Sequence, residues 1–261
     1  MFKDCDRCQY DRSQLVEVIC QLRFPTILSI SAREPVDFQE AIRADFPLYS
    51  RGEDVLPPKV TGAPGNLRLQ EQERVVNYQF LSADHRWKVN LTNSFIALAT
   101  PAYTRWEDFA KQLDKALAKF IEIYKPAYFS RVGLRFINAF SRQALELEDV
   151  PLSELFTPGY LGVLAEDDVL DRNVPVYTQE SEMLLSGGCR LKLRTGFAKV
   201  KKNNVEDKEL KFMLDIDLFM MGNVPVAHSA AALQTVHLQA DRVFRGAITE
   251  RLHQAMEPNA L

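Results

Sequence analysis

Apolar and polar residues alternate along several stretches of the chain, which is the pattern of a half-buried strand. The first stretch is residues 15–24, LVEVICQLRF, and the alternation is strictest in residues 85–92, HRWKVNLT. Stretches of the same kind predict strands over residues 67–72, 74–82, 94–99, 129–140, 181–200 and 209–221. Short connections between neighbouring strands favour antiparallel pairing. The prolines and glycines of residues 50–66 predict a loop instead.

Two long amphipathic helices follow from apolar residues spaced three and four apart. The first covers residues 105–124, and Thr104 and Glu107 have the spacing of a capping box at its start. The second covers residues 229–256, with Ser229 as its N-cap.

The same order of elements occurs twice in the chain. Short helices predicted over residues 36–45 and 151–157 complete two series of strand, short helix, antiparallel strands and long helix. The two halves are residues 15–126 and 127–261, and residues 1–14 precede them as a flexible N-terminus. The halves share no sequence identity that can be aligned, so the repeat is one of pattern only.

We therefore expect an α+β protein in which both halves contribute to one continuous, curved antiparallel sheet. The two long helices would lie on one face of this sheet and bury their apolar stripes there. The familiar shapes closest to this arrangement are the duplicated saddle of the TATA-binding-protein type and the helix-grip half-barrel. This comparison is an analogy of architecture and does not determine function.

Composition and charge exclude several classes of protein. The 261 residues are 46% apolar and 26% charged, as in an ordinary packed protein and unlike a disordered one. The net charge of -3 and pI of about 5.9 provide no global basic field for nucleic acid. No stretch approaches the roughly 18 apolar residues of a membrane helix. The first residues lack the apolar core of a signal peptide, so we expect a cytoplasmic location and no membrane partner.

The four cysteines, Cys5, Cys8, Cys20 and Cys189, are too few for a disulfide framework. Cys5 and Cys8 form a C-x-x-C pair, but no further cysteine or histidine stands at the spacing that a structural zinc site needs. Cys20 and Cys189 fall in predicted strands and are interpreted as core thiols. We expect neither a metal ion nor a cofactor.

Catalytic motifs are scarce in this chain. It contains no Walker loop, no G-x-S-x-G and no H-E-x-x-H, so we expect no catalytic residues. Asp215 and Asp217 alternate with apolar residues and share a strand face, where they could hold a divalent cation if another carboxylate converged on them. A metal-dependent enzyme built on these two residues is the third hypothesis for this protein.

Cationic side chains gather on one face of the predicted strands. Arg190, Lys192 and Arg194 alternate with leucines, so the three cations share the face opposite the core. The remaining candidates from earlier strands are Arg23, Arg86, Lys88, Arg131 and Arg135. Together these eight residues are the candidate site for an anionic partner.

A competing interpretation is that carboxylates neutralise this face. The symmetric hairpin register of the last two strands pairs Arg194 with Asp215 and Lys192 with Asp217, and leaves Arg190 opposite an apolar residue. Opposite charges that face each other across strands stabilise a sheet by roughly a few tenths of a kcal/mol per pair. Arginines of the earlier strands likewise either pair with carboxylates or face a ligand. Both interpretations stay open at this point.

Three segments resemble a known family. They are residues 18–25 (VICQLRFP), 103–109 (YTRWEDF) and 131–138 (RVGLRFIN). Their order and spacing are similar to those of a sporadically distributed bacterial family of uncharacterised proteins of about this length, and the likeness covers most of residues 15–140. The resemblance brings no catalytic residues with it. The patchy distribution of the family implies horizontal transfer, often together with antiviral defence of the CRISPR type or with toxin–antitoxin systems.

The leading hypothesis is a non-catalytic protein-binding or regulatory module that serves such a defence or toxin–antitoxin system. We expect this module to bind a protein partner. A homo-oligomer, in which the chain binds a second copy of itself, is a further possibility. The alternative hypothesis is a nucleic-acid or nucleotide binder that uses the cationic sheet face.

Overall fold

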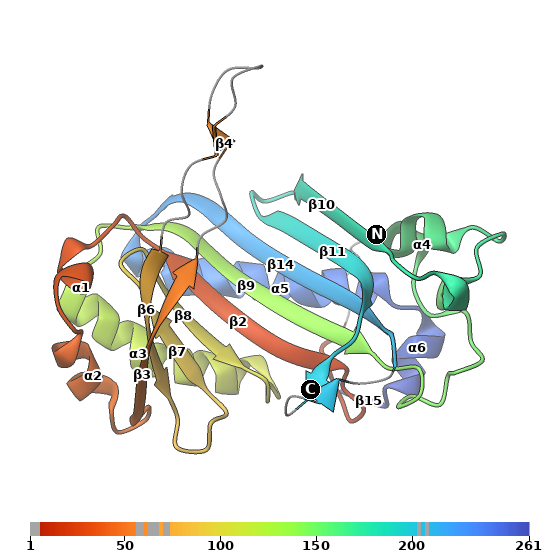
Figure 1. Ribbon diagram of the computed structural model, residues 1–261, viewed down its shortest axis with the longest axis horizontal. Helices are drawn as coiled ribbons and strands as arrows, with labels where there is room; N and C mark the ends of the chain where they lie inside the picture. Colours follow the sequence, from red (N-terminus) through yellow and green to blue (C-terminus); the bar gives the residue numbers. More distant parts are fainter. Residues whose placement is uncertain are drawn as a thin grey trace.

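The computed structural model describes residues 6–55, 60–61, 68–69, 74–202, 205–206 and 209–260. In this part of the chain the protein consists of a nine-stranded antiparallel sheet with long helices packed on it (Figure 1). The predicted α+β class, with an antiparallel sheet and two long helices, is confirmed.

The sheet has the strand order β10-β11-β14-β9-β2-β8-β7-β6-β3. The bounds of its strands are β2 Leu15–Arg23, β3 Leu48–Val55, β6 Arg74–Leu81, β7 Lys88–Leu91, β8 Phe95–Thr100, β9 Phe129–Phe140, β10 Thr178–Leu184, β11 Arg190–Ala198 and β14 Lys211–Val224. The central pair is β2 and β9, and β8 and β14 flank it on either side.

Three two-stranded pairs lie outside this sheet. They are β1 (Cys8–Tyr10) with β15 (Pro258–Ala260), β4 (Val60–Thr61) with β5 (Arg68–Leu69), and β12 (Lys201–Lys202) with β13 (Val205–Glu206). The first pair ties residues of the N-terminal stretch, which the sequence predicts to be flexible, to the other end of the chain. Of the strand predicted over residues 67–72, residues 67 and 70–72 lie outside the described part.

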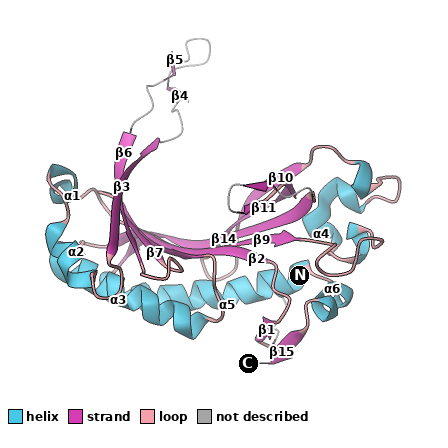
Figure 2. Cartoon of the chain, turned by 60° about the horizontal axis from the view of Figure 1, so that its bottom comes forward, coloured by secondary structure: helices cyan, strands magenta, loops and turns pink. Residues whose placement is uncertain are grey.

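The long helices α3 (Trp106–Tyr124) and α5 (Ser229–Ala247) run along one face of the sheet, beneath it in Figure 2. Their apolar stripes are buried there: the side chains of Phe109, Phe120 and Val236 have no exposed surface. The shorter helices are α1 (Leu28–Ala32), α2 (Val36–Ile42), α4 (Pro158–Leu161) and α6 (Glu250–Ala255), with 3-10 turns at Leu152–Glu154, Gly162–Ala165, Asp171–Asn173 and Val226–His228. None of the described helices is both long enough and apolar enough to cross a membrane.

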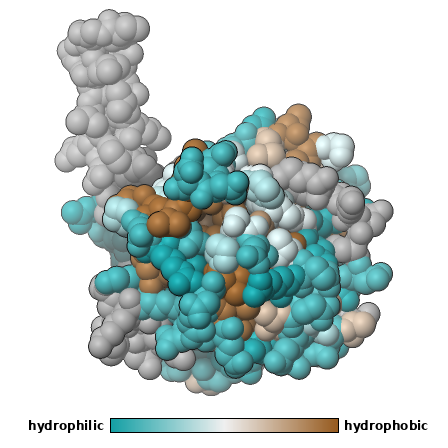
Figure 3. All heavy atoms as spheres, turned by 90° about the vertical axis from the view of Figure 1, so that its right-hand side faces the viewer, coloured by the Kyte–Doolittle hydropathy of each residue, from teal (hydrophilic) through white to brown (hydrophobic). Residues whose placement is uncertain are grey.

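None of the described helices lies on the opposite face of the central strands, and the sheet curves upward around that face at both ends (Figure 2). We call this surface of β2, β9, β14 and β11 the open face. At the end of the molecule where α4 and α6 lie, the surface is mostly hydrophilic with separate apolar patches (Figure 3). Exposed apolar side chains near α4 include Val163, Leu170 and Val176.

Two strand predictions need correction. Residues 48–55 form strand β3 and not the start of a loop, since they pair with β6 along their whole length. As an edge strand with most side chains exposed, β3 has no clear apolar alternation for a sequence pattern to detect. The single strand predicted over residues 181–200 is in fact the two strands β10 and β11. Gly187 and Gly188 adopt φ values of +89° and +81°, and the chain turns at these two glycines between β10 and β11.

The predicted helix caps are wrong in detail. Arg105 occupies the N-cap position of α3, and the Thr104 hydroxyl contacts the Asp108 carboxylate and caps no backbone N–H. Ser229 is the first residue of α5, where its hydroxyl donates to the carbonyl of Val226.

The helix predicted over residues 229–256 is broken in two. Ile248 is extended and bridges Phe156, and Thr249 then serves as N-cap of α6 by accepting a hydrogen bond from the N–H of Leu252. The backbone of residues 155–157 pairs with residues 247–249, so a contact distant in sequence interrupts a helical pattern.

Candidate functional site

The pairing of β11 with β14 decides which charges meet on the open face. Arg194 lies opposite Asp215, Lys192 opposite Asp217, and Arg190 opposite Phe219. This register is the one that the sequence predicts, and it is confirmed.

A hollow of about 450 Å³ lies on the open face. Five of the eight candidate residues line it: Arg23, Arg131, Arg135, Lys192 and Arg194. They come from the three strands β2, β9 and β11, so residues as far apart in sequence as Arg23 and Arg194 share one surface. The acidic and apolar side chains that also line the hollow include Glu182, Asp217, Phe219 and Met221.

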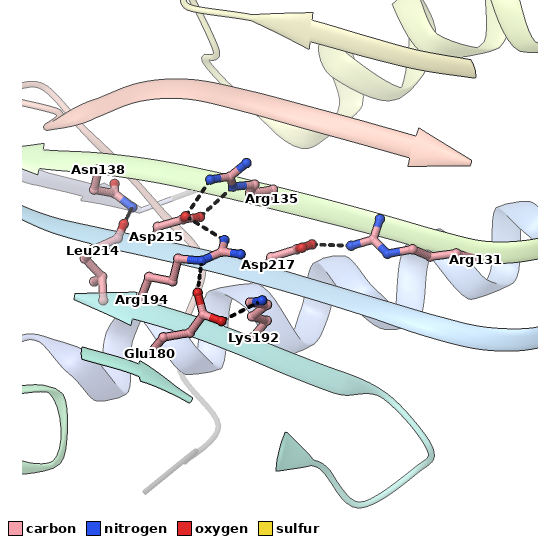
Figure 4. Close-up of polar contacts among 9 residues, drawn as sticks. All are labelled: Arg131, Arg135, Asn138, Glu180, Lys192, Arg194, Leu214, Asp215 and Asp217. Atoms are coloured by element: carbon pink, nitrogen blue, oxygen red, sulfur yellow. Dashed lines mark hydrogen bonds and ion pairs between the residues drawn. The ribbon is translucent and has the colours of Figure 1, made fainter. Parts of the chain in front are cut away.

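Asp215 is the centre of one ion-pair cluster on this face (Figure 4). Arg135 binds it with two parallel hydrogen bonds, Nε to Oδ1 at 2.7 Å and Nη2 to Oδ2 at 2.6 Å. Arg194 donates a third from Nη1 at 3.1 Å. The Asp215 side chain is only 9% exposed, and its hydrogen bonds raise the pKa of Arg135. Removing either arginine would leave a buried carboxylate undercompensated.

The edge strand β10 adds two carboxylates that sequence reasoning did not assign to this face. Glu180 binds both Lys192, at 2.7 Å, and Arg194, while Glu182 binds Arg190 at 3.1 Å. Lys192 therefore pairs with Glu180, although Asp217 is its cross-strand neighbour.

Arg131 forms an ion pair with Asp217 and packs over the ring of Phe219. Its Nη2 donates to Asp217 at 2.6 Å, and its Cζ lies 4.4 Å from the centroid of the Phe219 ring. Gly133 makes this possible, because a Cβ at that position would come within 2.6 Å of the Arg131 Nη1. The close neighbours of Gly133 are thus the side chains of Arg131 and Phe219.

Arg23 differs from the other cations of the hollow because it makes no ion pair with a described residue. Its Nε donates to Gln21 at 2.8 Å, and it lies directly opposite Arg131. Burial and the charge of Arg131 lower the pKa of Arg23. Among the described residues that line the hollow, Arg23 is thus the guanidinium that has no direct ion pair, although the Asp217 carboxylate acts on it at longer range.

Arg86 and Lys88 do not join this cluster. Lys88 lies on the open-face side of β7 opposite Ala99, and Arg86 stands on the exposed turn before it. Neither lines the hollow, and neither makes an ion pair with a described residue.

A second concavity, of about 140 Å³, lies on the helix side of the sheet. We call it the helix-side pocket; β1, the start of α3, α5 and the strands β9 and β14 enclose it. Its aromatic walls come from Tyr10, Tyr103, Trp106, Phe136 and Phe244.

His237 of α5 is the polar residue deepest in the helix-side pocket. It is 2% exposed, it stacks on Trp106 with ring centroids 4.6 Å apart, and neither ring nitrogen has a hydrogen-bond partner among the described residues. Asp241, one helical turn later, places Oδ2 3.7 Å from Nε2 of His237 and 3.8 Å from Nε of Arg7. Burial lowers the pKa of His237 to about 4 and raises the pKa of Asp241 to about 6.

Sequence reasoning missed the helix-side pocket. The available signal was a histidine and an aspartate four residues apart on the apolar side of a predicted helix. The pair can be recognised as part of a pocket only once the fold places Arg7 and Trp106 beside it.

The cysteines are distributed as follows. Cys20 and Cys189 are buried, as predicted. Burial raises the pKa of both thiols, that of Cys189 to about 11. Cys8 lines the helix-side pocket, and Cys5 lies outside the described residues. Within the described ranges, no three His, Cys, Asp or Glu side chains are grouped so that they could hold a metal ion.

No protein-family model matches the chain, and no curated protein is significantly similar to it in sequence.

Proposed function

We propose that this protein is a non-enzymatic binding module that receives an acidic segment of a partner protein on its open face. The observation that carries the proposal is the hollow on that face, which combines Arg23, a cation without a direct ion pair to any described residue, with the apolar side chains of Phe219 and Met221. Met221 is 60% exposed beside it. A carboxylate with an apolar neighbour fits this combination of groups.

The state of the remaining cations favours protein over nucleic acid. Arg131, Arg135 and Arg194 are already bound to carboxylates, and Glu180 and Glu182 do the same for Lys192 and Arg190. Phosphates of a nucleic acid would meet these carboxylates, and of the described cations that line the hollow only Arg23 has no ion pair and could bind phosphate without competition. A surface of mixed, mutually ordered charges is typical of specific protein contacts.

The strand order favours the duplicated saddle over the helix-grip half-barrel. The first strand of each half, β2 and β9, pairs at the centre, and the last strand of each half lies next to it. A duplicated saddle of the TATA-binding-protein type has two such halves meeting at the middle of one sheet. We infer this architecture for the chain and assign its function from the open face, since architecture alone does not determine function.

The experiment is affinity purification of the tagged protein from its host, after nuclease treatment, with two charge-reversal variants. Arg23→Glu alters the open face, and Arg33→Glu is the matched control at an exposed arginine that does not line the hollow. We expect wild type and Arg33→Glu to capture the same protein in stoichiometric amount, and Arg23→Glu to capture at least tenfold less. On the strength of the family resemblance, we propose that the captured partner is a component of an antiviral defence or toxin–antitoxin system.

Two outcomes would overturn the proposal. Equal capture by Arg23→Glu and wild type would remove the open face as the docking surface. Recovery of nucleic acid that nuclease or rising salt releases, without a protein, would favour the nucleic-acid alternative.

A further inference from the structure

The helix-side pocket contains a buried histidine, His237, beside a half-buried aspartate, Asp241, and neither is used by the rest of the fold. Buried side-chain nitrogens nearly always have a hydrogen-bond partner, so a histidine with two unpartnered nitrogens calls for an explanation. His237 is such a residue, and it lines a pocket of about 140 Å³. Cavities of roughly 150 Å³ are large enough to hold a benzene ring.

The charges around the pocket determine which ligand it suits. Arg7 and Arg105 both line it, but Arg7 is bound by Glu107 at 2.8 Å and Arg105 by Asp108 at 2.8 Å. The Asp241 carboxylate is left with contacts of 3.7 Å and 3.8 Å, neither of which is a short hydrogen bond. The charge that lacks compensation in the pocket is therefore negative.

The walls of the pocket favour an apolar body next to that charge. Phe136 and Phe244 lie on its sheet and helix sides, and Tyr103 packs edge-on against Phe136 at 5.8 Å. Aromatic rings attract organic cations through their π faces in addition to burying apolar surface. Aromatic walls, one undercompensated carboxylate and one imidazole lone pair together complement an ammonium group on a small apolar molecule.

We propose that the helix-side pocket binds a small protonated amine with an apolar body about the size of one ring, whose ammonium group donates hydrogen bonds to Asp241 and His237. Ser13, Thr104 and Arg105 stand at exposed positions on its outer rim. This site lies on the opposite side of the sheet from the open face, so it is independent of the protein-binding proposal.

The test compares three probes that share one ring and differ in charge: benzylamine, benzyl alcohol and benzoate. Binding is followed on wild-type protein through the imidazole NMR signals of His237, which the His237→Phe variant assigns. We expect benzylamine to shift these signals in a saturable manner, benzyl alcohol to bind at least tenfold more weakly, and benzoate to bind more weakly still.

Two variants test whether Asp241 is the residue that binds the ammonium group. Asp241→Asn is expected to reduce the affinity for benzylamine to that for benzyl alcohol, while Asp114→Asn, at an exposed position on α3, leaves both affinities unchanged. The comparison of the three probes on wild-type protein needs no variant, so the result stands even if one variant fails to fold.

Three results would overturn the proposal. Equal binding of benzylamine and benzyl alcohol would show that Asp241 recognises no charge. Preferential binding of benzoate would identify Arg7 as the recognition group and the ligand as an anion. The absence of any saturable shift would mean that the pocket holds water alone.

Discussion

Gly133 illustrates how one missing side chain organises the open face. The guanidinium of Arg131 occupies the space that a Cβ would take, and there it covers the Phe219 ring and reaches Asp217. Any larger residue at this position competes with the arginine for that space.

We expect Gly133→Ala to destabilise the protein by about 1–3 kcal/mol, because the added methyl group meets Arg131 at 2.6 Å and the Cβ of Phe219 at 2.9 Å. Gly52→Ala is the control, since its new Cβ would have its nearest contact at 3.6 Å. Urea denaturation measures both variants. The pair Gly133→Ala and Arg131→Ala should lose less together than the sum of the two, and simple additivity would argue against this account.

His237 and Asp241 of the helix-side pocket are expected to make the free energy of unfolding depend on pH in opposite directions. The pKa of Asp241 is about 6 in the folded protein and about 3.9 in an unfolded chain, so its contribution to stability is full below pH 4 and is lost as pH rises through 6. The pKa of His237 is lowered to about 4 from about 6.5, so its contribution is full above pH 6.5 and is lost as pH falls toward 4.

Single variants should separate these two contributions. As pH falls from 6.5 to 4, the stability of His237→Phe is expected to gain on the order of 1–2 kcal/mol relative to wild type. The stability of Asp241→Asn should fall relative to wild type by a smaller amount, because solvent screens the half-exposed Asp241 carboxylate. The other titratable and charged groups facing the pair are Arg7, Tyr103 and Glu107, which stay in place in both variants. Denaturant titrations at several pH values measure this, and parallel curves for both variants and wild type would contradict it.

At the scale of elements, α3 joins the two layers. Trp106 at its start donates from the indole nitrogen to Gln234 of α5 at 3.0 Å, and Phe109 and Phe120 fix it to the sheet. The helix ends at Lys125, whose N–H donates to the carbonyl of Ile121 while its backbone adopts the left-handed conformation at φ 47°. A residue with a Cβ is unfavourable there.

Lys125→Gly is therefore expected to stabilise the protein by about 0.5–1 kcal/mol. The matched control is Lys111→Gly in the interior of the same helix, which should cost about 1 kcal/mol. Chemical denaturation measures both changes. A loss of stability with Lys125→Gly would show that the lysine side chain contributes more than its backbone conformation costs.

The whole molecule depends on one sheet to which both halves of the sequence contribute. β2 and β9 are each paired on both sides, while β3 and β10 are the edges of the sheet. Opening either central strand breaks two sets of pairings and uncovers the apolar contacts of the helices.

Hydrogen exchange should therefore be slowest in residues 15–23 and 129–140 and faster in residues 48–55 and 178–184. Mass spectrometry of peptic peptides at rising denaturant measures this order. The two central strands are expected to lose protection together, and loss at clearly different denaturant concentrations would show that the halves unfold independently.

Local patterns in the sequence determined much of this protein. Alternation over residues 15–24 and 129–140 and the apolar stripe of residues 105–124 depend only on which side chains face the core, so β2, β9 and α3 were predictable. The register that sets Arg194 against Asp215 was also predictable, because a symmetric hairpin of these two strands brings the two residues opposite each other.

Only the tertiary structure decided the partners of the charges and the second site. The carboxylates of Glu180 and Glu182 meet the cations because β10 lies beside β11, and a hydrophobic pattern does not encode which strand is the neighbour. The helix-side pocket combines Arg7, Trp106 and His237, which are distant in sequence and converge through packing of the helices on the sheet. Burial creates its shifted pKa values, and burial is a property of the folded chain.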